Sequence, residues 1–322
     1  MSSTNSSLPP QLPPWRAAGH RYYSRNFYCR TRFGGPVWKV SLDAGCTCPN
    51  RDGTLARGGC VFCDPESFSP SRRLHLSSIS AQLDEGIRRV RTRHAAERFV
   101  AYFQPATNTY GPLPVLRQRY EEALAAAGVV GLAIGTRPDC VPDAVLDVLA
   151  ELSVRTWLTI EYGLQTIHDR TLDWLARGHR ADAFFDAARR SRRRGLEIGV
   201  HLILGLPGET ARDMQTTARE IARLGVASVK LHNLYVVRNT PLAERLATGQ
   251  FRLPDRDEYV GYVVDVLEVL PPDCAIDRLS GDAPRQYLIA PAWCSEKAAL
   301  RAAVEAELVR RGSWQGCKWE GR

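Results

Sequence analysis

Four cysteines lie within the stretch CTCPNRDGTLARGGCVFC at positions 46–63. The Gly, Asn, Asp and Pro residues between them predict a loop, because they supply the backbone angles that turns need. Thiolates bind soft metals and iron–sulfur clusters. Two interpretations are open: a structural zinc site that uses all four thiols, or an iron–sulfur cluster held by three of them, with one iron left open. Free buried thiols fit less well, because such cysteines are typically scattered along apolar segments.

Apolar runs that alternate with amphipathic stretches must position this loop. The predicted strands are Val37–Leu42, Phe99–Phe103, Val129–Ile134, Thr156–Ile160, Glu197–Leu204 and Ser228–Leu234. The predicted helices lie between them, near residues 77–95, 114–127, 142–152, 168–195 and 210–224. This alternation indicates an α/β fold with a parallel sheet and right-handed crossovers. The six βα units fit an open doubly wound sheet or most of a (β/α) barrel, and the periodicity leaves both open.

The chemically distinctive residues follow the predicted strands. The cysteine loop follows the first strand, FQPATNTYG the second and GTRPDC the third. EYGLQT, GLPGET and HNLYVVRNTPL follow the last three. Both architectures place ligands at the carboxyl ends of parallel strands. The six segments therefore predict one site on one face of the sheet.

Three regions are expected along the chain. Residues 1–20, rich in Ser and Pro, predict a disordered tail, and residues 21–255 predict the α/β core. Residues 256–322 predict a C-terminal extension packed on the core, with helices at Tyr259–Leu270 and near residues 295–311. The sequence has no apolar run near the ~20 residues that span a bilayer, and its N-terminus does not resemble a secretory signal. We therefore expect no membrane partner and a cytoplasmic location.

The chain is basic, with a formal net charge of +8 from 43 basic and 35 acidic residues. Such an excess favours polyanionic partners, nucleic acid above all. Arginines gather in RRSRRR at positions 189–194, and Arg88, Arg89, Arg91 and Arg93 form a second patch. Cations near helix C-termini on a solvated face are one explanation of both patches. Contact with the phosphates of an RNA is the alternative.

The segment VWKVSLDAGCTCPNRDGTLARGGCVFC resembles the radical S-adenosylmethionine superfamily, most closely its YhcC/YtqA type. AYFQ, VGLAIGTRPDCVPDAVLD, GLQTIHDRTLDWLARGH, HLILGLPGE, VKLHNLYVV and LIAPAW resemble the same family in its order, from about Phe33 to Trp293. TRPD, GLQ, RGH and GLPG also resemble the radical domain of the Elongator catalytic subunit. The resemblance implies that the core is a partial (β/α)6 TIM-like barrel.

By this resemblance Cys48, Cys60 and Cys63 ligate a 4Fe–4S cluster, with the spacing C-x11-C-x2-C. Cys46 lies where relatives need no thiol, so our hypothesis is that it is not a ligand. S-adenosylmethionine would bind the open iron, and one electron from a reductant protein such as a flavodoxin or ferredoxin would break its sulfonium C–S bond. The resulting 5′-deoxyadenosyl radical would abstract hydrogen from the substrate.

The resemblance also implies which strand-end residues bind S-adenosylmethionine. Gln104, Thr107 and Asn108 would hold its methionine amine or carboxylate, with a turn-forming role as the alternative. Glu161 and Gln165 would bind the ribose hydroxyls. A carboxylate that follows an apolar strand is costly to bury without a partner, which favours a functional role for Glu161.

The glycines of GLPGE are expected to contact the adenine. Gly205, Pro207 and Gly208 would let the backbone approach the base closely, as glycine does where a ligand meets main chain. The segment is not a phosphate-binding loop, because no GxxxxGK[ST] follows and the sequence has no GxGxxG. GxSxG and HExxH are also missing from the sequence, so hydrolase functions have no support.

Lys39, Arg137, Asp139, Arg177 and His179 are candidate substrate contacts. For Arg137 and Asp139 the alternative is an internal ion pair that holds the loop in place, since such pairs are common at strand ends. A structural role is the alternative for His179.

Similarity to the Elongator radical domain favours tRNA as the substrate, specifically a side chain on a wobble uridine. Two alternatives are a radical enzyme that acts on a small metabolite, and a zinc and nucleic-acid-binding protein without enzymatic activity. Cys274, Cys294 and Cys317 could form a second metal site, but their irregular spacing favours isolated thiols.

Overall fold

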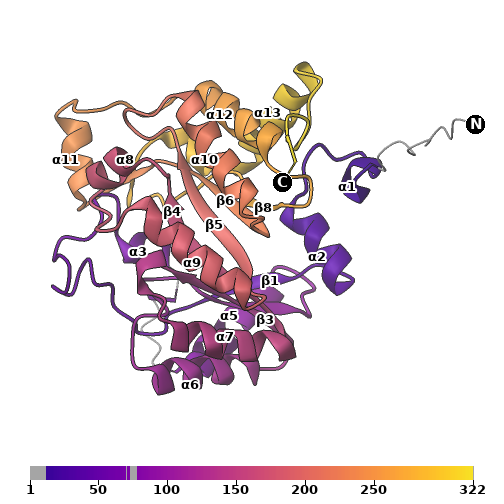
Figure 1. Cartoon of the computed structure of the whole chain (residues 1–322), viewed down its shortest axis with the longest axis vertical. Coiled ribbons are helices and arrows are strands. Elements are labelled where there is room, and N and C mark those ends of the chain that lie inside the picture. Colours follow the sequence, from indigo (N-terminus) through magenta and orange to yellow (C-terminus); the bar gives the residue numbers. More distant parts are fainter. Residues whose placement is uncertain (1–11, 70, 73–77, 322) are drawn as a thin grey trace, which may run out of the picture.

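In the computed structural model, which describes residues 12–69, 71–72 and 78–321, one parallel sheet of seven strands occupies the centre of the chain (Figure 1). In spatial order the strands are β1 (Trp38–Leu42), β2 (Phe99–Phe103), β3 (Val129–Thr136), β4 (Trp157–Gln165), β5 (Glu197–Leu204), β6 (Ser228–Asn233) and β8 (Ala275–Arg278). Every neighbouring pair is parallel. The first six strands follow chain order, as successive βα units require.

The sheet curls into a partial barrel, which confirms the expected fold class. Lys39 lies on the edge strand β1 and Asp277 on the opposite edge strand β8. The Lys39 amine is nevertheless only 3.0 Å from an Asp277 carboxylate oxygen, so the two edges face each other across the interior. The seventh strand, β8, comes from the C-terminal extension and was not predicted. The extension therefore completes the core sheet as well as packing on it.

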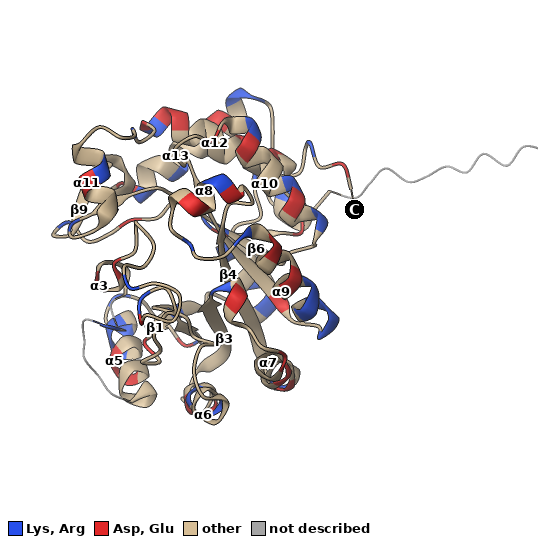
Figure 2. Cartoon of the chain, turned by 60° about the vertical axis from the view of Figure 1, so that its left-hand side comes forward, with Lys and Arg blue, Asp and Glu red and all other residues tan. Residues whose placement is uncertain are grey.

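Helices cover the outer face of the sheet (Figures 1 and 2). They are α5 (Ile79–Arg91), α6 (Leu113–Leu124), α7 (Asp143–Arg155), α9 (Ala181–Arg193) and α10 (Ala211–Arg223). Two helices of the extension add to this layer, because α12 (Arg256–Val269) packs on α10 and α13 (Lys297–Arg310) packs on α12. Along β4, Leu158 and Ile160 belong to the apolar core under the helices, whereas Trp157 and Glu161 face the barrel interior. This alternation separates an apolar outer face from a polar inner one.

Shorter elements complete the fold. They are α1 (Pro14–Ala17), α2 (Arg25–Phe33), α3 (Pro65–Phe68), α8 (Asp169–Trp174), α11 (Pro241–Ala247), the 3-10 turns η1 (Pro138–Cys140) and η2 (Ala292–Ser295), and an antiparallel ribbon of β7 (Val236–Val237) with β9 (Leu288–Ala290). Among the described residues, no helix has the length and apolarity that crossing a bilayer requires.

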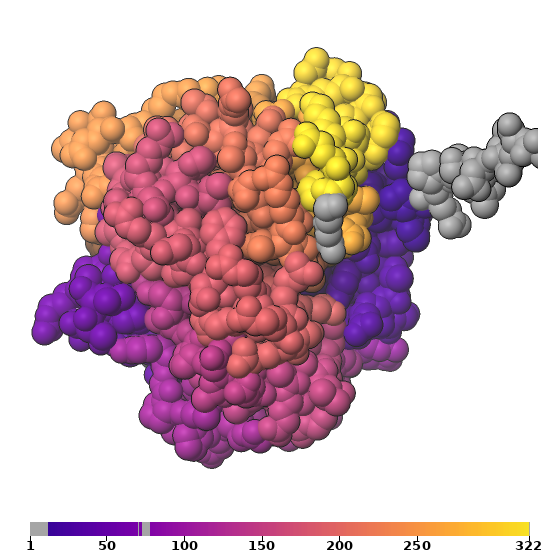
Figure 3. Space-filling view, in the orientation of Figure 1, coloured from indigo at the N-terminus to yellow at the C-terminus, as the bar shows by residue number. Residues whose placement is uncertain are grey.

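The N-terminal segment is more ordered than the sequence predicted. Residues 1–11 of the expected tail lie outside the described residues, but α1 forms within residues 12–20 and Trp15 is buried. The Trp15 indole donates a hydrogen bond of 2.8 Å to the carbonyl of Pro272, in the extension. The disorder predicted for residues 12–20 is therefore wrong. Figure 3 shows the segment after α1 beside the C-terminal residues, where the backbone N–H of Gln315 donates to the Arg21 carbonyl at 2.9 Å.

The single helix predicted near residues 168–195 is also wrong, because α8 and α9 are separated by a loop at 175–180. Ala176 and Gly178 in this loop have φ of 53° and 70°, and residues in the left-handed region end helices. A Cβ on Gly178 would lie 2.7 Å from the Asn50 side-chain oxygen, so the glycine permits close contact with the cysteine loop. The break places Arg177 beside the thiols.

Candidate functional site

The carboxyl ends of the strands open into one cavity of about 600 Å³. Five of the six predicted strand-end segments line it, through residues such as Cys48, Gln104, Gln165 and Asn233. The segment after β5, at 205–210, does not. The predicted convergence on one face is thus observed for all strand ends except one.

Val61 holds the paired cysteines at this cavity. It lies between Cys60 and Cys63 in the chain and is buried in a small apolar cluster with Leu175 and Leu242. The Val61 amide donates to the Leu175 carbonyl, and the Val61 carbonyl accepts from the Leu242 amide, both at 3.0 Å. The Cys63 amide closes a turn onto the Cys60 carbonyl at 2.9 Å. An apolar residue between the two thiols therefore fixes their loop against the end of α8 and the start of α11.

The four loop cysteines divide into three and one. Cys48, Cys60 and Cys63 line the cavity at the strand ends. Cys46 instead lines a neighbouring pocket with Arg119, whose guanidinium is 3.8 Å from the Cys46 sulfur. Burial raises the pKa of the Cys46 thiol, and burial also raises that of Cys63, to about 12. This division agrees with the hypothesis that Cys46 is not a ligand, which remains a prediction.

Arg177 lies against the thiols. Its guanidinium donates to the Cys60 sulfur at 3.2 Å and to the Gly163 carbonyl at 2.6 Å. The Asn50 amide nitrogen is 3.6 Å from the same sulfur. Two buried N–H groups, one of them on a cation, thus lie beside the Cys60 sulfur. Arg177 was predicted to contact substrate. Its position beside Cys60 also suits a hydrogen bond to a sulfur that holds the cluster.

His179 lies behind Arg177 and does not line the cavity. A ring nitrogen of His179 is 3.2 Å from the Arg177 guanidinium. Burial, followed by the charge of Arg177, lowers the pKa of His179 to about 4, so the imidazole is neutral at physiological pH. The alternative of a structural histidine fits these contacts.

The loop after β2 brings two of its three predicted residues to the cavity. Gln104 lines it and accepts a hydrogen bond of 3.2 Å from Ser41. Thr107 also lines it, and its buried hydroxyl has no partner among the described residues. Asn108 is fully buried behind them and donates to the Gly135 carbonyl at 2.8 Å. These contacts fit the turn-forming alternative for Asn108, and its contact with S-adenosylmethionine stays a prediction.

Glu161 was predicted to follow a strand, but it lies inside one. The predicted strand ended at Ile160, but β4 continues to Gln165, so the Glu161 carboxylate faces the barrel interior. Gln165 lines the cavity with φ of 75°, and Ala106 lines it with φ of 62°. Residues other than glycine rarely adopt such angles, and they are concentrated at functional sites.

GLPG lies outside the cavity lining. A Cβ on Gly205 would be 2.7 Å from the Pro254 ring, and Gly205 has φ of 77°. Packing and backbone geometry therefore account for this glycine. Pro207 and Gly208 do not line the cavity either, so the expected adenine contacts of all three residues stay a prediction.

Arg137 and Asp139 form the internal ion pair that was the alternative for them. Two guanidinium nitrogens of Arg137 donate to the two carboxylate oxygens of Asp139, at 3.0 and 2.8 Å. Arg137 also lines the cavity, and its remaining terminal nitrogen has no partner among the described residues. Asp139 lines the neighbouring pocket instead. Only Arg137 of this pair is positioned to contact a ligand in the cavity.

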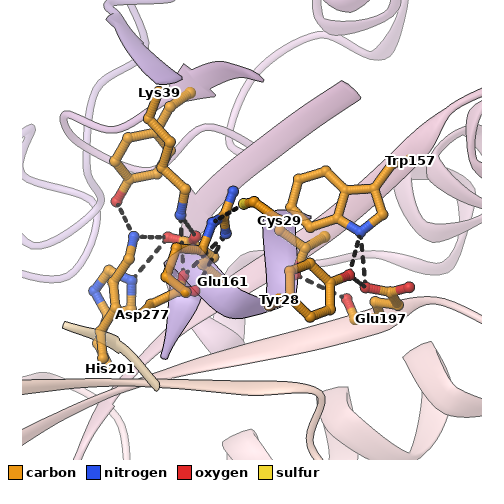
Figure 4. A network of polar contacts seen from close by, with 12 residues as sticks. Tyr28, Cys29, Lys39, Trp157, Glu161, Glu197, His201 and Asp277 are labelled. Carbon is orange, nitrogen blue, oxygen red and sulfur yellow. Dashed lines mark hydrogen bonds and ion pairs between the residues drawn. The ribbon is translucent and has the colours of Figure 1, made fainter. Parts of the chain in front are cut away.

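A buried charged network fills the inner end of the cavity (Figure 4). Both Glu161 oxygens are bound: one accepts from Lys39 at 2.8 Å, and the other contacts Lys230 and lies 2.9 Å from a nitrogen of His201. Lys39 also pairs with Asp277. The members come from β1, β4, β5, β6 and β8, so the network joins most of the barrel. Since both of its oxygens are engaged, the ribose contact predicted for Glu161 would require the network to open.

Charge and burial set the protonation of this network. Burial raises the pKa of the Glu161 carboxyl, but Lys230 and Lys39 outweigh it and hold the value well below its usual range. Burial lowers the pKa of Lys230 to about 7, in spite of Glu161. Burial and the charge of Lys230 also lower the pKa of His201. Glu161 is therefore ionised, while Lys230 titrates near neutrality.

Sequence reasoning missed several residues of this inner end. They are single polar residues on apolar strands, namely Lys230, His201, His232, Asp277 and Arg278. The missed signal was an isolated charged or imidazole side chain within GVHLIL, SVKLHN and CAIDRL. Because side chains alternate along a strand, Lys230 and His232, two positions apart on β6, share the face that points away from the helices.

The donor set suits the expected 4Fe–4S cluster. Three thiols line one cavity, and buried N–H donors of Arg177 and Asn50 lie beside one of the sulfurs. Within the described residues, no three His, Cys, Asp or Glu side chains form a ligand set for a single metal ion. A cubane cluster attaches its ligand sulfurs to three separate irons, so these sulfurs need not meet at one point.

The low pKa of Lys230 predicts a pH-dependent stability. Between pH 7 and its ordinary value of 10.5, Lys230 binds fewer protons in the folded chain than in the unfolded one. The free energy of unfolding should therefore rise with pH in this window, by at most about 1.4 kcal/mol per pH unit from this group. Urea unfolding at several pH values should show this rise in the wild type and a flatter dependence in Lys230→Met. Lys297→Met, at an exposed lysine, is the control and should keep the wild-type slope.

Comparisons with known proteins agree with this geometry. A profile of the radical SAM superfamily matches residues 48–221, and a profile of the Radical_SAM C-terminal domain matches residues 226–310. The uncharacterized protein YtqA of Bacillus subtilis is 39% identical over 94% of this chain and 94% of its own length. Protein YhcC of Escherichia coli is 40% identical over 83% of this chain and 85% of its own length.

More distant relatives share part of the chain or only its fold. A tRNA uridine(34) acetyltransferase of Dehalococcoides mccartyi is 27% identical over 55% of this chain and 39% of its own length. The solved structure of the archaeal Methanocaldococcus infernus Elp3 is 17% identical, with a TM-score of 0.65 over 87% of this chain and 64% of that one. That structure shares the fold. From the two matching profiles and the full-length similarity to YtqA and YhcC, the chain belongs to the radical S-adenosylmethionine superfamily, whose cofactors are a 4Fe–4S cluster and S-adenosylmethionine.

Proposed function

We propose that this chain is a radical S-adenosylmethionine enzyme that acts on a side chain of the wobble uridine of a tRNA. The observation that carries the radical chemistry is the division of the loop thiols. Cys48, Cys60 and Cys63 line the cavity at the strand ends, whereas Cys46 lies outside it. Three thiols suit a cluster whose remaining iron is open to S-adenosylmethionine.

When bound and reduced by a partner such as a flavodoxin or ferredoxin, the cluster supplies the electron that cleaves S-adenosylmethionine and so starts hydrogen abstraction. The chain's own residues hold and orient the reactants. Arg177 stabilises negative charge on the Cys60 sulfur through its N–H donor. Gln104, Thr107 and Gln165 line the cavity. The first two would bind the methionine part of the cofactor, and Gln165 would bind its ribose.

The tRNA part of the proposal has two supports. The net charge of +8 favours a polyanionic partner. The partial similarity to a tRNA uridine(34) acetyltransferase, over 55% of this chain, suggests uridine 34 as the target. A cytoplasmic location follows from such a substrate and is part of the same proposal.

The arginine runs give this proposal little support. Basic residues gather at the C-terminal end of α9 (Figure 2), but Arg190 pairs with Asp186, and Arg194 with Asp147. Glu85 similarly binds two arginines of α5. Four of the nine arginines in the two runs are thus paired with carboxylates, so phosphate contacts would fall to the rest of the runs or to other basic residues.

A cluster measurement with two cysteine variants tests the radical chemistry. Anaerobically reconstituted and dithionite-reduced wild type should contain a full cluster and form 5′-deoxyadenosine. Cys48→Ala should lose both, because it removes one of three ligands. Cys46→Ala is the matched control and should keep both, since its thiol lies in the neighbouring pocket. Loss of iron in Cys46→Ala would overturn the assignment of ligands, and zinc without iron in the wild type would overturn the radical mechanism.

Binding and turnover with tRNA test the substrate. The chain should bind tRNA more than tenfold tighter than a random polyanion of equal length at matched salt, and affinity should fall as salt is raised. The tRNA should also be needed for substrate-coupled hydrogen abstraction. Equal affinity for both polymers would point instead to a small metabolite as the substrate.

A further inference from the structure

The inner end of the cavity carries more positive than negative charge. Glu161 and Asp277 are its two carboxylates. Its basic residues are Arg25, Lys39 and Arg278, and Lys230, whose pKa is about 7, adds a fourth positive charge when protonated. The third carboxylate of the lining, Asp282, is paired with Lys297, which is outside the cavity lining. At least one positive charge is therefore left without a counter-charge in a partly buried site, which is unfavourable unless an anion binds.

Arg278 is the cation that is left over. Arg25 pairs with Asp277 at 3.2 Å, and Lys230 contacts Glu161. Lys39 contacts both Glu161 and Asp277 (Figure 4). Across the described part of the chain, by contrast, no ion pair or hydrogen bond engages the Arg278 guanidinium. Arginine presents several N–H donors in one plane, which is the geometry that binds a carboxylate or phosphate through two parallel hydrogen bonds.

A neutral histidine lies near this arginine. Burial, and after it the charge of Arg278, hold the pKa of His232 well below its usual range. The Nε2 atom of His232 is buried and has no partner among the described residues. Tyr235, which also lines the cavity, experiences the charge of Arg278 as well. A neutral imidazole and a phenol can each donate one hydrogen bond to an anion that Arg278 holds.

We propose that the inner end of the cavity is an anion-binding subsite, in which Arg278 and His232 bind a carboxylate or phosphate group of the substrate. The subsite rests on the proposed function, because the anion belongs to the molecule from which hydrogen is abstracted. It is formed by β6 and β8, whereas the thiols lie on the loop after β1. Substrate and cofactor would thus bind to different walls of one cavity.

Thermal unfolding of the reconstituted, S-adenosylmethionine-loaded protein tests this subsite. The probes are succinate and inorganic phosphate, with succinamide as the neutral analogue and sodium chloride at matched ionic strength. A ligand that binds the folded chain raises its unfolding midpoint with concentration, which gives an apparent Kd. At least one anion should stabilise the wild type and succinamide should not. Whichever anion binds identifies the group as a carboxylate or a phosphate.

Variants locate the binding. Arg278→Gln should raise the apparent Kd of the anion at least tenfold. Arg278→Lys keeps the charge but not the two parallel donors, so it should raise the Kd less. Arg93→Gln, at an exposed arginine outside the cavity, should bind like the wild type. If Arg278→Gln does not fold, the lysine variant carries the comparison.

Three results would overturn the subsite: no stabilisation of the wild type beyond that by sodium chloride, equal stabilisation of wild type and both Arg278 variants, or anion binding that S-adenosylmethionine displaces. The last would place the anion where the methionine carboxylate binds. Because the readout does not need cofactor cleavage, failure to form 5′-deoxyadenosine would refute the proposed function while leaving the subsite intact.

Discussion

The buried carboxylate of Glu161 is the constraint on which the interior of the barrel depends. It is 1% exposed, and an ionised group so deeply buried must be surrounded by charged or hydrogen-bonding partners. Those partners are Lys39 from the edge strand β1, His201 from β5 and Lys230 from β6. Lys39 also forms an ion pair with Asp277 on the opposite edge strand, β8. The ion pairs around this one carboxylate thus connect the two edge strands of the sheet. They also make the interior of the barrel polar, as a site for a polar ligand requires.

The thiol end of the cavity depends on a second constraint, the packing of loops against one another. Val61 is buried between Leu175, in the loop after α8, and Leu242, in the first turn of α11, and this contact fixes the two cysteines beside it. The break between α8 and α9 adds Arg177 to the same place. Reactive groups on loops are thereby supported by apolar contacts beneath them, as an oriented site requires. One cavity connects this end to the charged interior.

The sequence predicted the alternation of strands and helices, because side-chain periodicity and the strand-end loops are local features. It did not predict β8 or the break at Gly178, since each depends on contacts with distant segments: β8 on pairing with β6, and Gly178 on the proximity of Asn50. The thiol site was predictable from spacing and resemblance. The charged network was not, because an isolated Lys or Asp on a strand does not reveal its partner across the barrel, and Glu161 appeared to follow its strand only because β4 was predicted too short.

The most direct test of a three-cysteine cluster with one open iron is electron paramagnetic resonance of the reduced, reconstituted protein with and without S-adenosylmethionine. We expect a signal of a reduced 4Fe–4S cluster that changes when S-adenosylmethionine is added, because the cofactor binds the iron that no cysteine holds. A cluster signal unaffected by S-adenosylmethionine would contradict this account, since it would indicate that all four irons are already ligated. A protein that retains zinc and takes up no iron would contradict it as well.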